Sequence, residues 1–181
     1  MNADLKIIFA GPVGAGKTTA ICSISDVPPV TTDEMASDMT KQRKQQTTVA
    51  FDYGVMDLDG GEKIHLYGTP GQERFDFMWE ILAKNALGLV LLIDNTRKEP
   101  LRDLLFFLES FDSLIRKSSL AIGITQMDKS AQPKLSEYNK KLRELKYCAA
   151  VFEVDAREKK DVSILVQSLL YSIDNGLEYA S

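Results

Sequence analysis

Short apolar runs alternate with longer stretches of helical periodicity along this chain. Four of the runs are short and mainly apolar, which is typical of strands that are buried on both faces of a parallel sheet: residues 5–10, 87–93, 120–124 and 149–154. Apolar positions at helical spacing fill most of the intervals between them: residues 18–24, 77–84, 101–115, 135–146 and 162–175. The alternation predicts an α/β fold, with helices on both faces of a mostly parallel sheet.

A polar turn adds two further strands to this sheet. Residues 49–58 and 63–67 flank Asp59-Gly60-Gly61, a sequence that favours a hairpin turn. We therefore predict a six-stranded, mostly parallel sheet with one antiparallel edge strand. Before the hairpin, residues 26–46 contain two prolines and a polar run, which predict a long loop. Loops of about 20 residues are uncommon in compact domains and usually functional.

Composition narrows the class of protein. The length of 181 residues predicts one domain spanning 1–181. The net charge of −4 argues against a nucleic-acid-binding surface or a polybasic membrane patch. We find no apolar run of about 18 residues, no signal peptide and no lipidation motif, so we expect a cytoplasmic protein without a stable membrane anchor. The two cysteines, Cys22 and Cys148, fit a reducing compartment, and we interpret both as packing residues.

The first candidate chemistry follows the first predicted strand. The segment from Gly11 to Thr18, GPVGAGKT, matches the P-loop pattern G-x-x-x-x-G-K-[ST] and opens a predicted helix. In such a loop, backbone N–H groups surround a phosphate, Lys17 neutralises phosphate oxygens, and the Thr18 hydroxyl binds Mg²⁺. This predicts nucleoside triphosphate binding but does not choose between ATP and GTP. The residues expected at the nucleotide are Gly11, Val13, Gly14, Ala15, Gly16, Lys17, Thr18 and Thr19.

Four further segments follow in a fixed order: Thr47-Thr48 before a strand, GTPGQERF from Gly68 to Phe75, TQMD from Thr125 to Asp128, and Asp155-Ala156-Arg157 after the last strand. With the P-loop, they resemble the Ras-like small GTPases. The TPGQERF segment is similar to a prokaryotic branch of that family, associated with roadblock-type proteins and related to gliding-motility polarity GTPases. The resemblance implies a P-loop NTPase fold, a Ras-like three-layer sandwich, with a roadblock-type regulator as partner.

The resemblance also implies which residues act on the phosphates. Thr48, with Thr47 as the alternative, would bind Mg²⁺ together with Thr18 and contact the γ-phosphate. The Gly71 N–H would bond the same phosphate, and Gln72 would orient the attacking water. The expected catalytic residues are therefore Gln72, Thr48 and Gly71, with Mg²⁺ as cofactor and GTP and GDP as substrate and product.

A second set of residues would select the base. The Asp128 carboxylate would accept hydrogen bonds from guanine N1–H and N2–H₂, whereas adenine offers an acceptor at N1 and leaves the carboxylate unpaired. Thr125 and Gln126 belong to the same motif, although Gln126 stands where the family has a lysine. Backbone N–H groups at Ala156 and Arg157 would meet guanine O6.

Three departures from the family pattern bear on catalysis. Gly68 stands where the family has an aspartate in the Mg²⁺ shell, and Asp33 or Asp38 of the long loop are candidates to replace it. Val13 crowds the space beside the γ-phosphate, so we expect slow hydrolysis. Asp155 replaces a serine, which leaves the tightness of its loop open.

Other residues leave alternatives open. Arg43 or Arg74 would act as an arginine finger supplied by this chain, although a solvated loop arginine is the commoner situation for either. Trp79 would serve equally well in the core or on a partner surface. His65 is expected to face outward from an edge strand.

The favoured function is a molecular switch that hydrolyses GTP to GDP and phosphate, and signals through loops 26–48 and 68–78. One alternative is a guanine-nucleotide-binding scaffold with impaired catalysis. A P-loop kinase acting on a small metabolite is a further alternative, although the arginine-rich lid of such enzymes is missing from the sequence.

Overall fold

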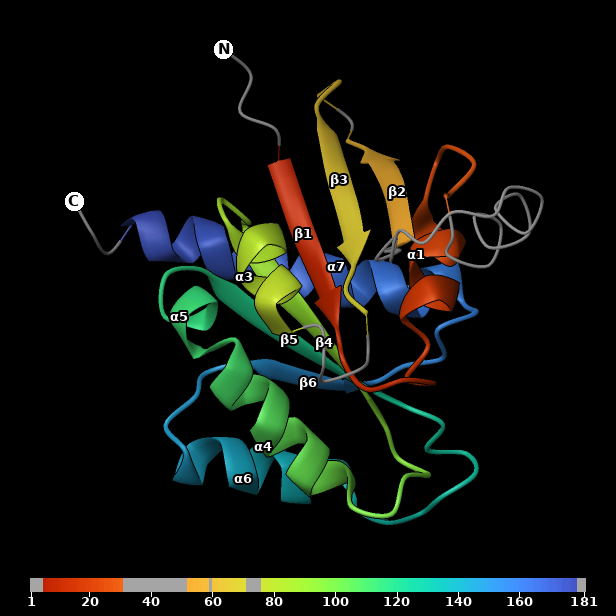
Figure 1. Cartoon of the computed structure of the whole chain (residues 1–181), viewed down its shortest axis with the longest axis vertical. Helices are drawn as coiled ribbons and strands as arrows, with labels where there is room; N and C mark the ends of the chain where they lie inside the picture. The colour runs from red at the N-terminus through yellow and green to blue at the C-terminus, as the bar shows by residue number, and fades with distance from the viewer. Residues whose placement is uncertain (1–4, 31–51, 59, 71–75, 179–181) are drawn as a thin grey trace, which may run out of the picture.

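One six-stranded sheet forms the centre of the fold (Figure 1). The structure is a computed structural model, which describes residues 5–30, 52–58, 60–70 and 76–178. The strands run in the spatial order β2-β3-β1-β4-β5-β6: β1 (Leu5–Ala10), β2 (Asp52–Asp57), β3 (Lys63–Gly68), β4 (Gly88–Asp94), β5 (Ser119–Thr125) and β6 (Ala150–Glu153). Only β2 is antiparallel to its neighbour. The predicted mostly parallel sheet with one antiparallel edge strand is confirmed.

Helices cover both faces of the sheet, as predicted (Figure 1). Their bounds are α1 (Lys17–Ile24), α3 (Asp76–Ala83), α4 (Pro100–Ser110), α5 (Asp112–Ile115), α6 (Leu135–Glu144) and α7 (Lys159–Glu178). The two cores follow the alternation of side chains along the strands. Ile7 and Phe9 of β1 belong to the core under α1 and α7, whereas Ile8 and Ala10 belong to the core under α3, α4 and α6.

The predicted helix over residues 101–115 is divided at Phe111. Its backbone (φ −105°, ψ 12°) leaves helical geometry, so α4 ends at Ser110 and α5 begins at Asp112. The Phe111 ring is buried and stacks on Trp79, with ring centroids 5.2 Å apart. The periodic pattern continues across the break because Phe111 still faces the core.

The edge position expected for His65 and the packing role expected for the two cysteines are wrong. Strand β3, which carries His65, lies between β2 and β1, and the Tyr53 hydroxyl lies 2.7 Å from His65 Nδ1. His65 is therefore a half-buried residue of an interior strand. Cys22 and Cys148 are both exposed and do not serve as packing residues.

The parallel strands β1, β4, β5 and β6 all end at the same edge of the sheet, where ligands bind in open α/β folds. The P-loop, the TQMD segment and the Asp155–Arg157 segment each follow one of these strands. The topology therefore brings together three segments that are far apart in the sequence. Within the described ranges, no helix has the length and apolar character needed to cross a membrane.

Candidate nucleotide-binding site

The loop between β1 and α1 requires glycine at specific positions. Gly11 (φ 140°) lies against β4, and a Cβ there would overlap with the Leu92 carbonyl oxygen. Gly16 (φ 93°) precedes α1, and a Cβ there would lie 2.9 Å from the Ala156 Cβ. Both have left-handed backbones that favour glycine. The P-loop pattern thus reflects two close backbone approaches, one to β4 and one to the loop after β6.

Lys17 is buried beneath this loop. Its Nζ donates hydrogen bonds to the carbonyl oxygens of Gly11 and Pro12, each at 2.8 Å. Burial lowers the Lys17 pKa to about 8, the nearby Asp52 carboxylate opposes this shift, and Arg97 adds to it. The ammonium group is therefore charged at neutral pH and held at the loop that would surround a phosphate.

Thr18 is bonded to a carboxylate that sequence reasoning missed. Its Oγ1 donates to Asp52 Oδ2 at 2.5 Å. Hydroxyl and carboxylate oxygens are the donors that Mg²⁺ prefers, so this pair fits the predicted cofactor. No group of three or more His, Cys, Asp or Glu side chains in the described part of the chain can hold a metal by itself. A cation here would need additional ligands, such as nucleotide phosphates or water.

A pocket of about 610 Å³ lies between the P-loop and the loops after β5 and β6, a size that suits a small-molecule ligand. Asp128, exposed to solvent, is among its lining residues. The pocket unites most of the predicted nucleotide-binding residues: Gly14, Ala15, Gly16, Thr19, Thr125, Gln126, Asp128, Ala156 and Arg157. Its lining does not include Gly11, Val13, Lys17 or Thr18, and Val13 is 57% exposed.

Thr125 joins the TQMD segment to the P-loop. Its buried Oγ1 lies 3.2 Å from the Ala15 carbonyl oxygen and 3.3 Å from that of Ile93. The single hydroxyl proton serves one of these acceptors at a time. The following residue, Gln126, has a left-handed backbone (φ 58°), and its Oε1 accepts a hydrogen bond from Lys129 Nζ at 3.0 Å.

The loop after β6 is fixed by its own charges. The Arg157 N–H donates to Asp155 Oδ1 at 3.0 Å, and Arg157 Nη2 donates to Asp155 Oδ2 at 2.6 Å. The guanidinium group and the backbone N–H lower the Asp155 pKa to about 2. The Asp155 N–H in turn donates to Asp161 Oδ2 at 3.0 Å. Replacing the family's serine by Asp155 therefore leaves a well-bonded loop.

Asn95, which directly follows β4, is a second residue that sequence reasoning missed. It is 1% exposed, and its Nδ2 donates to the carbonyl oxygens of Ser130 at 2.7 Å and Pro133 at 3.2 Å. The Tyr138 hydroxyl donates to Asn95 Oδ1 at 2.7 Å. These bonds hold the loop that carries Asp128. The available signal was a polar residue following a buried strand at the same sheet edge as TQMD.

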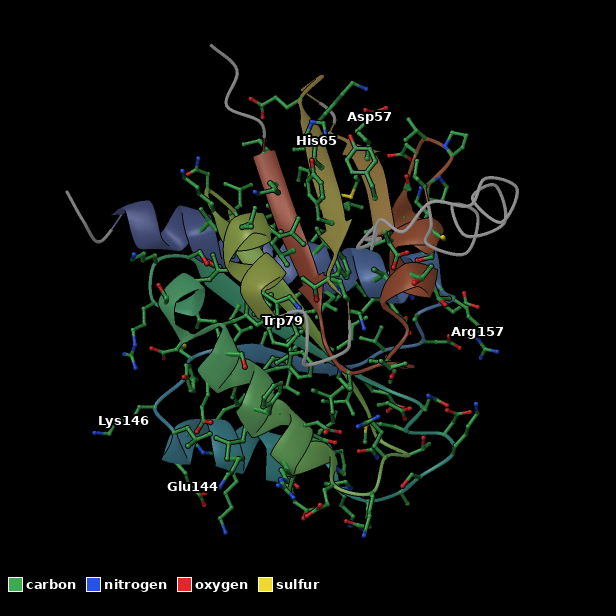
Figure 2. All side chains as sticks on the ribbon, in the orientation of Figure 1. Asp57, His65, Trp79, Glu144, Lys146 and Arg157 are labelled. Carbon is green, nitrogen blue, oxygen red and sulfur yellow. The ribbon has the colours of Figure 1, made fainter. Side chains whose placement is uncertain are left out.

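The beginning of the predicted second switch is tied to the core. The Thr69 N–H donates to the Phe9 carbonyl oxygen at 2.8 Å, and Thr69 is buried. Trp79 is also buried, and Figure 2 shows it in the interior near α3 and α4, whereas Arg157 lies at the periphery. Of the two roles considered for Trp79, the structure supports the core role.

The remaining predicted catalytic residues and their alternatives lie outside the described residues: Asp33, Asp38, Arg43, Thr47, Thr48, Gly71, Gln72 and Arg74. Their roles stay predictions. The single-domain boundary of 1–181 also stays a prediction.

Comparison with known proteins shows the family of this chain. Residues 28–176 match a protein family described as conserved hypothetical ATP binding protein. The chain belongs to that family. The match to the conserved hypothetical ATP-binding family begins after the P-loop and includes the TQMD and Asp155–Arg157 segments.

Individual relatives extend the likeness to small GTPases. The chain is 30% identical over 94 residues to an uncharacterized protein of Methanocaldococcus jannaschii, covering 52% of this chain and 53% of that protein. It is 30% identical over 111 residues to the Ras-related protein Rab-12 of Homo sapiens, covering 60% and 41%. It is 31% identical over 107 residues to intraflagellar transport protein 22 of Chlamydomonas reinhardtii, covering 59% and 53%.

The chain thus spans about half the length of the curated relatives that it matches. The family, the fold and these relatives support a nucleotide-binding protein similar to small GTPases.

Proposed function

We propose that this protein is a GTP-hydrolysing molecular switch that binds GTP and GDP with Mg²⁺. The observation that carries the proposal is that the P-loop, the TQMD segment and the Asp155–Arg157 segment line the same pocket. In the proposed arrangement, the first segment binds phosphates and the other two select the base. The similarity to a Ras-related protein supports the same assignment.

Base selection would depend on Asp128. Its carboxylate accepts two hydrogen bonds from guanine, whereas the adenine edge offers it an acceptor at N1. Because the Arg157 N–H already bonds to Asp155, Ala156 is the better of the two predicted donors to guanine O6. The description of the matched family names ATP, which makes ATP the competing ligand to test.

Phosphate binding would use groups already positioned by the fold. Lys17 supplies a cation beside the P-loop backbone, and the Thr18 hydroxyl supplies an oxygen ligand for Mg²⁺. A bound Mg²⁺ would neutralise phosphate charge. The roles of Thr48, Gly71 and Gln72 rest on the family resemblance. Slow hydrolysis would follow from the Val13 side chain, which belongs to the P-loop and is exposed.

Signalling would follow from loss of the γ-phosphate, which releases segments 26–48 and 68–78 from their contacts with it. A roadblock-type protein is the proposed regulator, on the strength of the TPGQERF resemblance alone. The hydrogen bond from Trp79 to Pro70 supports a second switch whose first residues are anchored to the core.

Two measurements test the function. Displacement of a fluorescent GDP analogue by GTP, GDP and ATP gives the base preference, and we expect ATP to compete at least 100-fold more weakly than GTP. Single-turnover hydrolysis, with Gln72→Leu as the comparison, then tests catalysis. If ATP competed as well as GTP or better, the assignment of guanine as the preferred base would be overturned. Guanine binding without turnover, even with a roadblock partner, would support the scaffold, and ADP formation that depends on a small acceptor would support the kinase.

A further inference from the structure

The carboxylate missing from β3 has a counterpart on the neighbouring strand. Gly68 ends β3, where the family resemblance implies an aspartate in the Mg²⁺ shell, and its register partner on β2 is Asp52. A Cβ built at residue 68 would lie 3.1 Å from both Cβ and Oδ2 of Asp52. The Asp52 side chain therefore occupies the space that a side chain at position 68 would need.

The surroundings of Asp52 are those of a residue in a phosphate and cation site. Its residue surface is only 7% exposed, and burying a carboxylate is costly unless charged or hydrogen-bonding groups compensate for it. Asp52 favours the charged form of Lys17 and accepts the Thr18 hydroxyl proton at 2.5 Å. Asp52 is the first residue of an edge strand, and that position alone does not explain why a carboxylate is buried there.

The direction of the hydrogen bond from Thr18 matters for cation binding. A hydroxyl group has one proton and two lone pairs. By accepting the proton, Asp52 turns the lone pairs of Thr18 Oγ1 toward other partners, and a divalent cation is the partner that a P-loop threonine takes. The same carboxylate adds negative charge beside the cation.

We propose that Asp52 supplies the Mg²⁺-shell carboxylate of this protein from β2, in place of the residue absent at Gly68. The assignment rests on the proposed function and extends it. It replaces the hypothesis that Asp33 or Asp38 takes this role. It also makes Asp52 a positioning residue that acts through Thr18 and the cation. Because Asp52 begins β2, cation binding would also stabilise the pairing of β2 with β3.

The test measures dissociation of a fluorescent GDP analogue over a range of Mg²⁺ concentrations and in EDTA. We expect Asp52→Asn to need about 10–100-fold more Mg²⁺ for the same retention of nucleotide, the range typical of lost outer-shell partners. Dissociation in EDTA should match that of the wild type. Electron paramagnetic resonance titration of the GDP complex with Mn²⁺ measures the same loss of cation affinity directly.

The matched control is Asp57→Asn. Asp57 lies at the opposite end of β2 (Figure 2), is exposed and pairs with Lys63 Nζ at 2.6 Å. The Asp57→Asn variant removes the same charge from the same strand, so its Mg²⁺ dependence should equal that of the wild type.

An exchange of the two residues provides a second test that does not depend on Asp52→Asn folding. Asp52→Gly alone should lose Mg²⁺-dependent retention, and adding Gly68→Asp should restore it by returning a carboxylate to β3. A wild type that retains no guanine nucleotide would overturn the proposed function and this assignment together. Equal Mg²⁺ dependence in the wild type and either Asp52 single variant, or no recovery in the exchange variant, would overturn this assignment alone.

Discussion

The Trp79 indole Nε1 donates a hydrogen bond to the Pro70 carbonyl oxygen at 3.1 Å. This bond joins the core of the protein to the first residues of the proposed second switch. Trp79 belongs to α3, and its ring also stacks on Phe111, which directly follows α4. We therefore expect a change in the second switch to alter the surroundings of the buried Trp79 ring.

We expect the intrinsic fluorescence of the protein to report the nucleotide state. Trp79 is the single tryptophan of the chain, and the environment of its indole N–H depends on Pro70. Exchange of GDP for a non-hydrolysable GTP analogue should change the emission intensity or wavelength. The matched Trp79→Phe variant keeps a ring, loses the signal, and should be destabilised by about 1–3 kcal/mol in urea unfolding because Pro70 loses its donor. Identical spectra in both nucleotide states would contradict this link.

Asn95 should control both stability and base binding. Asn95→Leu removes two donors to the carbonyls of Ser130 and Pro133 and leaves the buried Tyr138 hydroxyl without its acceptor, and an unpaired buried polar group costs about 1–3 kcal/mol. The loop bearing Asp128 would loosen, and the affinity for GDP should fall. Tyr138→Phe is the control because it removes only the bond to Asn95 Oδ1 and keeps both loop contacts. Urea unfolding and GDP titration separate the two effects, and equal losses of affinity in both variants would argue against the positioning role.

The strands and the P-loop could be predicted from local sequence patterns, whereas the position of Asp52 could not. Apolar runs predicted β1, β4, β5 and β6 because both faces of the sheet are covered there, so pattern and burial agree, and the turn at residues 59–61 predicted β2 and β3. The P-loop was predicted because its glycines and Lys17 form one continuous motif. Asp52 was missed because its role depends on the register between β2 and β3, which brings it beside Gly68. The hairpin pattern predicted that these two strands pair, but it did not specify which residues lie opposite each other.

Nucleotide affinity should fall at alkaline pH because Lys17 loses its proton. Burial lowers the Lys17 pKa to about 8, so above that pH the nucleotide-free site loses the cation that attracts phosphate. The stability of the ligand-free protein should change in the opposite direction. The unfolded chain keeps this proton up to the ordinary lysine pKa of 10.5, whereas the folded protein loses it near pH 8. The contribution of Lys17 to the free energy of unfolding therefore rises between about pH 8 and pH 10.5. GDP titrations from pH 6.5 to 9.5 measure the first effect.

Lys17→Arg is the control for this pH dependence. Arginine stays charged throughout the range, and guanine deprotonation affects both proteins equally. The variant should bind more weakly but with a flatter pH profile. Parallel profiles for the two proteins would show that Lys17 does not titrate in this range.

Gly16 should be intolerant of any side chain. Gly16→Ala places a Cβ 2.9 Å from the Ala156 Cβ and forces a left-handed backbone (φ 93°) on alanine. Gly61→Ala shares the backbone problem (φ 81°) in the hairpin, but its Cβ would meet nothing within 4 Å. Both should lose about 1–2 kcal/mol of stability from backbone strain, but only Gly16→Ala should also weaken GDP binding, by at least tenfold. Equal GDP affinities in the two variants would contradict the contact between the P-loop and the loop after β6.

Asp128→Asn should exchange guanine for xanthine. The asparagine amide donates where the carboxylate accepted, so it opposes guanine N2–H₂ and instead pairs with the O2 carbonyl of xanthine while still accepting from N1–H. GDP affinity should fall at least 100-fold, and xanthosine diphosphate should bind better than to the wild type. Glu153→Gln is the matched control because it removes one negative charge from the same pocket. Displacement titrations with both diphosphates measure the exchange. A loss of GDP binding without any gain for xanthosine diphosphate would assign Asp128 to the loop structure, and unchanged GDP binding would remove it from the site altogether.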